Sequence, residues 1–267
     1  MSGGIHVGIG GWTYQPWRGT FYPPGLPHAR ELEYAAARLT AIEINATHYR
    51  LQKPESFARW AEAAPPGFLF TVKASRFCTN RKLLGEAGAA IERFCAQGIT
   101  GLGDKLGPIL WQFMPTKRFD PEEFAAFLEL LPDAQDGVRL RHALEVRHQS
   151  FRDPRFVAMA REAGAAIVFA DAAAYPAIAD LTADIVYARL QRAREEEPTG
   201  YAAAELDRWA DVARGWASGA APAGLDYVVA EPPPQRPREV FLFMIDGAKI
   251  RAPAAAEALI ARLGRNG

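Results

Sequence analysis

Residues 41–45 read Ala-Ile-Glu-Ile-Asn and residues 68–73 read Phe-Leu-Phe-Thr-Val-Lys, so both are short apolar runs that end in a polar or charged side chain. The pattern returns at residues 107–112, 142–147, 166–171, 185–190 and 240–246. Strands that are buried on both faces read as near-continuous apolar runs, so charges that recur only at their carboxyl ends need a special environment. One mouth of a parallel barrel, where the strand ends converge, provides it.

Strand-like and helix-like segments alternate along the chain, which predicts an α/β fold with a parallel sheet. Besides the seven runs above, we expect a strand near 5–10, and helices near 30–39, 54–63, 84–97, 121–131, 154–163, 202–217 and 253–263. Eight strands in 267 residues favour a (β/α)8 TIM barrel over an open doubly wound sheet. Asp120 and Asp153, each followed by proline, are expected to cap helices.

Two connections depart from the alternation of strands and helices. We expect the sixth connection, residues 172–184, to be irregular because it is short and interrupted by proline. The seventh contains the stiff run Ala-Glu-Pro-Pro-Pro-Gln-Arg-Pro at 230–237 and is expected to be irregular there too. No shift in composition divides the chain, so residues 1–267 are expected to form a single TIM-barrel domain.

Because its charges balance, the chain as a whole has no net charge that would attract nucleic acid or an anionic membrane. Lys and Arg number 31, as do Asp and Glu, so binding to nucleic acid would depend on a local basic patch. Cys78 and Cys95 are too few for a metal cluster and are expected to be reduced thiols. The N-terminus lacks a signal-peptide pattern and no apolar run could span a bilayer, so we expect a cytoplasmic protein with no membrane partner.

Side-chain alternation places polar residues inside the predicted barrel. Glu43 and Asn45 share one strand face, as do Glu145 and Arg147, and both pairs should point inward near the carboxyl rim. By the same alternation we expect these residues to be joined there by Lys73, Gln112, Asp171, Arg189 and Asp246. The alternative is a buried network of ion pairs that closes the core without chemistry.

Four of these residues are candidate catalytic groups: Glu43, Lys73, Glu145 and Asp171. An enclosed lysine at a strand end can bind an anion, transfer a proton or form a Schiff base. An adjacent carboxylate such as Glu43 would raise the pKa of Lys73, which disfavours a nucleophile and favours ligand binding.

The loop at residues 10–23 carries five aromatic side chains beside the same rim. Trp12, Tyr14 or Trp17 could stack on a sugar or base, whereas Phe21 and Tyr22 are expected to attach the loop to the barrel.

Two histidines, His48 and His148, follow inward-ending strands. A structural role is favoured for each, and a divalent metal stays open because no specific ligand motif supports one. The cofactor is therefore unidentified.

Cations at other strand ends offer further anion sites. Arg189 is kept as an anion ligand, while Arg192 and Arg194 are expected on the surface beside Glu195-Glu196-Glu197. Arg76, Arg81 and Lys82, after the third strand, could extend a groove for an anionic polymer or form an ordinary exposed loop.

At these residues the chain resembles the YecE-like family, also called domain of unknown function 72. The matching stretches are 8–14, 17–23, 43–49, 68–73, 106–112, 145–151 and 187–189. The resemblance implies a TIM barrel but no established reaction, and the family is similar in architecture to endonuclease IV and xylose isomerase, which hold divalent metals with His, Glu and Asp. Three positions depart from the family pattern: Gln191 replaces a usual histidine, Asp246-Gly247 replaces Asn-Asn, and His48 replaces an aromatic residue.

Three functions follow from this set. The first is a hydrolase or lyase acting on a phosphorylated or nucleic-acid-like substrate. The second is metal-independent sugar chemistry by Glu43 and Glu145, which we expect to be bridged by Lys73 or Arg147. The third is a non-enzymatic module that binds a small molecule, a phosphate-containing ligand or nucleic acid. The candidate binding residues are Trp12, Tyr14, Asn45, Tyr49, Gln112, Arg147, His148 and Arg189.

Overall fold

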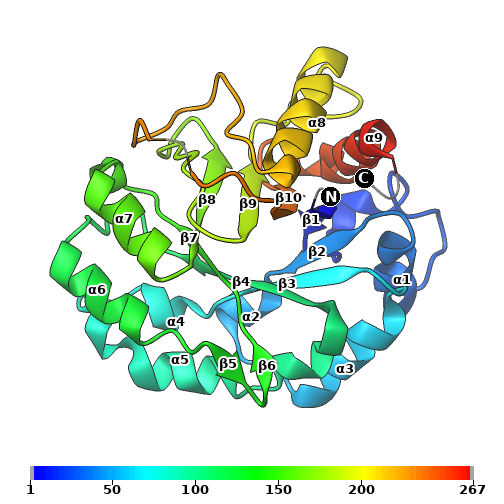
Figure 1. The fold of residues 1–267 in the computed structure, drawn as a ribbon. Coiled ribbons are helices and arrows are strands. Elements are labelled where there is room, and N and C mark those ends of the chain that lie inside the picture. The colour runs from blue at the N-terminus through cyan, green and yellow to red at the C-terminus, as the bar shows by residue number, and fades with distance from the viewer. Residues whose placement is uncertain (1–2, 232, 265–267) are drawn as a thin grey trace.

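Eight parallel strands close into a barrel in the computed structural model, which describes residues 3–231 and 233–264 (Figure 1). The order around the barrel is β1-β10-β9-β8-β7-β4-β3-β2. The strands are β1 Ile5–Gly10, β2 Ala41–Ile44, β3 Leu69–Lys73, β4 Leu106–Gln112, β7 His142–Glu145, β8 Ala166–Asp171, β9 Ile185–Leu190 and β10 Glu239–Met244. The predicted (β/α)8 barrel is confirmed.

Helices surround the strands, and each expected helix is present with slightly different ends (Figure 1). The α-helices are α1 Glu31–Ala36, α2 Ala46–Tyr49, α3 Pro54–Ala63, α4 Arg76–Thr79, α5 Gly88–Cys95, α6 Pro121–Glu129, α7 Pro154–Glu162, α8 Ala203–Ser218 and α9 Ala252–Leu263. Short 3-10 turns occupy Gln15–Trp17, His28–Arg30, Leu84–Ala87, Ile99–Lys105, Gln149–Phe151 and Lys249–Arg251. The carboxylates of Asp120 and Asp153 cap α6 and α7, as predicted.

Both connections predicted to be irregular are so. Residues 172–184 contain no helix, and the described part of 219–238 runs without helix or strand from the end of α8 to β10. Within the described residues, no helix is long and apolar enough to cross a membrane.

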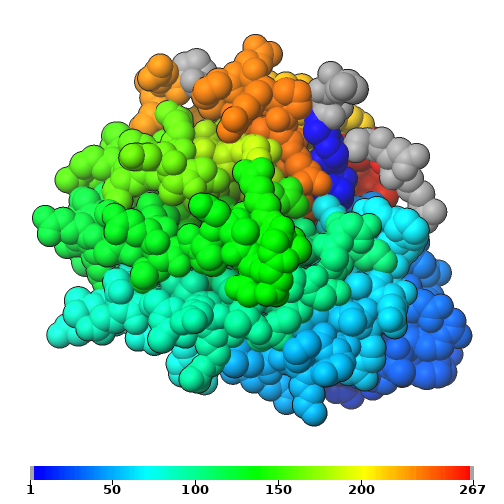
Figure 2. Space-filling model, turned by 60° about the horizontal axis from the view of Figure 1, so that its bottom comes forward, coloured from blue at the N-terminus to red at the C-terminus, as the bar shows by residue number. Residues whose placement is uncertain are grey.

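The sequence analysis missed a small antiparallel hairpin, β5 Ala134–Gln135 with β6 Val138–Arg139. Its turn is Asp136-Gly137, with φ of 50° and 78°, and this dipeptide favours such two-residue turns. The hairpin precedes β7 and so lies at the amino ends of the strands, in green at the centre of the face shown in Figure 2. It therefore takes no part in the barrel mouth at the carboxyl ends.

The core has two layers that follow the predicted alternation. Ile42, Ile44, Leu144 and Val146 belong to the larger cluster that packs between strands and helices. The smaller cluster fills the barrel interior, with members on almost every strand: Ala41, Leu69, Leu110, Ala143, Ala166, Val168, Ile185, Tyr187, Phe241 and Phe243. Residues two positions beyond these inner side chains therefore enter the mouth.

Candidate functional site

A cavity of about 470 Å³ opens at the carboxyl ends of the strands. The first loop forms one wall, and the ends of β2, β3, β4, β9 and β10 form much of the rest. Nine of the residues selected from the sequence line it: Trp12, Trp17, Asn45, Tyr49, Lys73, Gln112, Arg147, Arg189 and Asp246. The charged lining residues are four cations and one carboxylate: Lys73, Arg147, Arg189, Lys249 and Asp246. The wall therefore favours an anionic ligand.

Glu43 and Glu145 lie beneath this cavity, fully buried, and a single guanidinium joins them. Arg189 donates from Nη2 and Nε to the two oxygens of Glu43, over 3.1 and 3.2 Å. Its Nη1 donates to Oε2 of Glu145 over 2.6 Å. The carboxylates were expected to be bridged by Lys73 or Arg147, but the residue that connects both is Arg189. Its reach across the barrel is a property of tertiary packing.

Further donors complete the coordination of both carboxylates. The Tyr187 hydroxyl donates to Glu43 Oε2 over 2.7 Å. Gln112 Nε2 donates to Glu145 Oε2 over 2.8 Å, and Arg147 Nε donates to Glu145 Oε1 over 2.9 Å. Every carboxylate oxygen therefore has a donor from the protein itself.

These contacts set the protonation state of Glu145. Burial alone would raise its pKa, but the charges of Arg189 and Arg147 outweigh burial and lower the pKa to about 2. A carboxylate this acidic is a poor proton acceptor at neutral pH. The predicted buried ion-pair network is thus present, and it removes the simplest acid-base role for the carboxylate pair.

Lys73 differs from its neighbours in the mouth. Its side chain is only 8% exposed, yet its ammonium makes no hydrogen bond or ion pair with any residue the structure describes. Burial, followed by the charge of Arg189, lowers its pKa to about 8 against the attraction of Glu43 and Glu145. We expected a carboxylate to raise this pKa; Glu43 and Glu145 do act in that direction, but burial and the charge of Arg189 outweigh them.

Asp171 does not join the group, contrary to the alternation argument. It lies on the outer face of β8 with Phe169, whose ring packs against the tryptophans of α8. Its carboxylate instead pairs with Arg192 at 3.0 Å. The inward positions of β8 are Val168 and Ala170, and Ala170 lies in register with Arg189. The prediction was therefore wrong by one residue: the even-numbered positions of β8, not Asp171, face the barrel interior.

Two other candidates lie outside the cavity wall. The Nδ1 atom of His148 lies 2.8 Å from the Ser150 hydroxyl and accepts the Ser150 amide, so this histidine caps a 3-10 turn. The Tyr14 ring packs edge-on against Trp17 and lies 4.7 Å from the Lys249 ammonium. Tyr14 therefore positions two lining residues without lining the cavity. Phe21 and Tyr22 attach the loop to the barrel, as predicted.

Lys249 and Thr13 also line the cavity, although neither was kept as a candidate from the sequence. The position of Lys249 after the eighth strand, where barrels often bind phosphate, was the available signal. Asp246 reaches the wall through a left-handed backbone, with φ of 59°. Gln191 is absent from the wall, and its amide nitrogen is buried without a partner in the described structure.

The donor set at the mouth does not fit a metal ion. His48 Nδ1 is 2.8 Å from the carbonyl oxygen of Ala74, and His148 is engaged with its capping turn. The oxygens of Glu43 and Glu145 are occupied by cationic and neutral donors. Within the part of the chain that the structure describes, no three His, Cys, Asp or Glu side chains are grouped to hold a metal.

Comparison with known families gives a match along almost the whole chain. A family profile described as "Protein of unknown function DUF72" matches residues 6–267. The protein YecE of Escherichia coli K12 is 27% identical over 150 residues, which cover 55% of this chain and 50% of YecE. YunF of Bacillus subtilis is 27% identical over 159 residues, covering 57% and 54%. The matches thus span about half the length of these relatives.

A solved structure supports the same architecture. A DUF72 family protein of Thermotoga maritima superposes with a TM-score of 0.68 at 23% identity, covering 96% of each chain. This similarity supports the barrel fold independently of the strand count.

Proposed function

The chain belongs to the DUF72 family, a family of unknown function, and from its barrel mouth we propose a metal-independent lyase whose reactive group is the Lys73 amine. The substrate we propose is a phosphate-bearing carbonyl compound. The observation that carries the proposal is a buried, unpaired amine facing a polar cavity whose other cations can hold the phosphate.

Reactivity follows from the protonation state of Lys73. With a pKa of about 8, roughly a tenth of the side chain is neutral at pH 7, against about one part in 3,000 for an unperturbed lysine. The neutral amine is the nucleophile in Schiff-base chemistry. The surroundings of Lys73 thus raise the reactive fraction roughly 300-fold.

The reaction we propose balances without a cofactor. The Lys73 nitrogen bonds to the carbonyl carbon, and the carbonyl oxygen leaves as water after two proton transfers. The iminium makes the adjacent carbon acidic, so a C–H proton there passes to water. The electron pair left behind expels the phosphate from the next carbon as its C–O bond breaks, so the phosphate is the first product and an unsaturated imine stays on Lys73. Water then hydrolyses the imine, which restores the amine and releases the second product. Because Glu145 is a poor base here, water and the substrate phosphate carry the protons.

Two cations are placed to hold the phosphate. Arg147 lies in the cavity wall with its guanidinium 4.4 Å from the centroid of the Tyr175 ring, which fixes its plane. Lys249, which follows the last barrel strand, lies with its ammonium 4.7 Å from the centroid of the Tyr14 ring. Both reach the cavity that Lys73 faces.

Pyridoxal 5′-phosphate, used purely as a phosphate-bearing aldehyde probe, tests the proposal. After borohydride reduction, peptide mass spectrometry should find Lys73 labelled ahead of the exposed Lys53 and Lys82. Pyridoxal without phosphate should label it less, and Lys249→Met should reduce only the advantage given by phosphate. Labelling confined to exposed lysines would contradict the proposal.

A further inference from the structure

A second surface beside the mouth is not explained by the lyase proposal. The large apolar side chains that the described structure leaves most exposed are Tyr49, Leu51, Phe77 and Leu83, at 43 to 64% exposure. They come from only two stretches, which follow β2 and β3. Exposed apolar groups gathered at one place indicate a binding surface.

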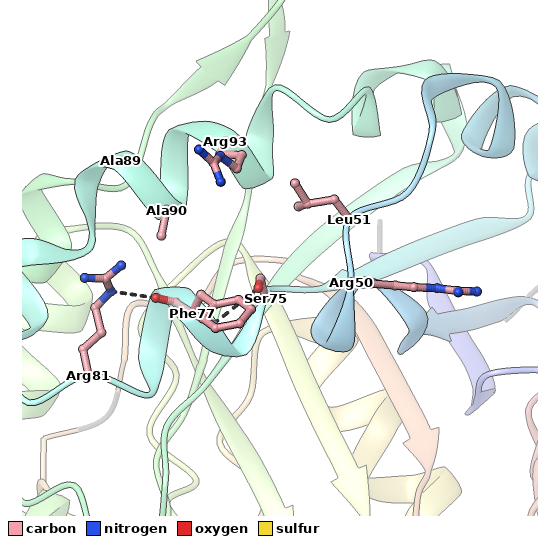
Figure 3. Close-up of a pocket in the computed structure, with 8 residues that line it drawn as sticks. All are labelled: Arg50, Leu51, Ser75, Phe77, Arg81, Ala89, Ala90 and Arg93. Atoms are coloured by element: carbon pink, nitrogen blue, oxygen red, sulfur yellow. Dashed lines mark hydrogen bonds between the residues drawn. The ribbon is translucent and has the colours of Figure 1, made fainter.

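Part of this surface is a cavity of about 430 Å³, which we call the arginine-phenylalanine pocket. Figure 3 shows the Phe77 ring at its centre, below Ala90 and Arg93 of α5, with Arg81 to one side and Leu51 to the other. The full lining is Arg50, Leu51, Ser75, Phe77, Arg81, Ala89, Ala90 and Arg93, which includes no acidic residue.

The arginines of the pocket are available to a ligand. Arg81 donates from Nε to the Phe77 carbonyl oxygen over 2.7 Å, which fixes the stem and leaves its terminal nitrogens free of described partners. The side chains of Arg50 and Arg93 make no ion pair with any described carboxylate. In Figure 3 the Arg50 side chain extends away from the Phe77 ring, so Arg81 and Arg93 are the pocket cations beside the ring. The guanidinium of Arg76 lies 5.4 Å from the centroid of the same ring.

The pocket and the mouth are lined by residues that are neighbours in the chain. Tyr49 lines the mouth, while the next two residues, Arg50 and Leu51, line the pocket. On the neighbouring strand Lys73 lines the mouth and Ser75 lines the pocket. A chain-like ligand could therefore occupy both at once.

We propose that the arginine-phenylalanine pocket binds single-stranded nucleic acid, one unit of which extends into the mouth. Arginines neutralise backbone phosphates, and an exposed aromatic ring stacks on any base. Phe77 supplies the ring, and Arg81 and Arg93 flank it. Because the whole chain carries no net charge, this local patch supplies the attraction. The proposal rests on the lyase proposal in one respect: a strand unit that carries a free aldehyde, as a sugar that has lost its base does, would present it to Lys73.

A short fluorescein-labelled oligodeoxythymidine tests the pocket by fluorescence anisotropy. We expect saturable binding that Phe77→Ala weakens about tenfold, as the loss of one stacked base predicts. Arg81→Gln and Arg93→Gln should each weaken binding and reduce the slope of affinity against salt by about one. The exposed Arg139, on the hairpin at the amino ends of the strands, provides the control variant Arg139→Gln, which should bind normally.

The two proposals fail separately. Lys73→Met should abolish aldehyde trapping yet leave most oligonucleotide binding. Phe77→Ala should weaken oligonucleotide binding and leave aldehyde trapping intact. Oligonucleotide binding that is absent, or that Phe77→Ala leaves unchanged, overturns the pocket proposal. So does tighter, Phe77-dependent binding of poly-glutamate, which would identify an acidic protein partner. Phe77 is 60% exposed, so its replacement should leave the fold intact.

Discussion

Replacing Lys73 by methionine should make the folded protein more stable at neutral pH. The folded environment lowers the lysine pKa from 10.5 to about 8, because burial and Arg189 disfavour the charged form. One pKa unit corresponds to about 1.4 kcal/mol, so the charged side chain costs the fold about 3 kcal/mol at pH 7. Methionine has a similar length, fills the same space and carries no charge.

The pH dependence gives this prediction a second signature. Between pH 8 and 10.5 the unfolded chain still binds the Lys73 proton while the folded chain has lost it, so the contribution of Lys73 to wild-type stability should rise with pH. The variant should lack that rise, and the stability gap should close across this window. Burial raises the pKa of both cysteine thiols to about 12, and that contribution is common to both proteins.

Urea unfolding followed by tryptophan fluorescence, at pH 7 and in steps to pH 10.5, measures both effects. The reasoning is refuted if Lys73→Met is less stable than wild type at pH 7, because Lys73 would then be a structural cation. A constant gap between the two proteins at every pH would equally refute the assigned origin of the pKa shift.

Other predictions concern the residues beneath and around the mouth. Arg189→Met should lower the free energy of unfolding by about 3 kcal/mol or more, because it leaves two buried carboxylates without their shared cation. Adding Glu43→Gln and Glu145→Gln should restore much of this stability. A loss below about 1 kcal/mol in urea unfolding would argue against the network. Because the pKa of Glu145 falls from 4.5 to about 2 on folding, its stabilisation is complete above pH 4.5 and disappears towards pH 2, so acid unfolding curves of Glu145→Gln should be flatter there. Gly8→Ala should destabilise the barrel by about 2 kcal/mol, since the new Cβ would lie 1.9 Å from the Ala41 carbonyl oxygen; an unchanged melting temperature would contradict this.

The fold was predictable because local signals and global topology agree. Each strand is a buried apolar run, and α3, α6, α7 and α9 have a proline at their start, in α6 and α7 behind the aspartate caps Asp120 and Asp153. The alternation also placed Glu43 and Glu145 correctly on the inner face. The alternation of side chains along a strand fixes which residues face inward wherever the sequence distinguishes the two faces.

The site was less predictable, for reasons that are physical. Asp171 ends a run that is apolar on both faces of β8, so the sequence alone does not fix which residues face inward. In the structure Ala170, in register with Arg189, takes the inner position. The bridge from Arg189 to two carboxylates on β2 and β7 depends on barrel closure, which brings strands far apart in sequence within reach. The pKa of Lys73 depends on that bridge, so it too lies beyond sequence reasoning.

This dependence also explains how an ion-pair network and a reactive amine can coexist in one mouth. If the two carboxylates beneath Lys73 were free, their attraction would keep the amine protonated. Burial is the main cause of the lowered lysine pKa, and Arg189, which neutralises the carboxylates, adds its own repulsion. In the proposed mechanism the buried network is therefore a positioning and electrostatic support: Arg189 makes no contact with a reacting atom, but its removal should raise the pKa of Lys73 and slow aldehyde trapping at pH 7.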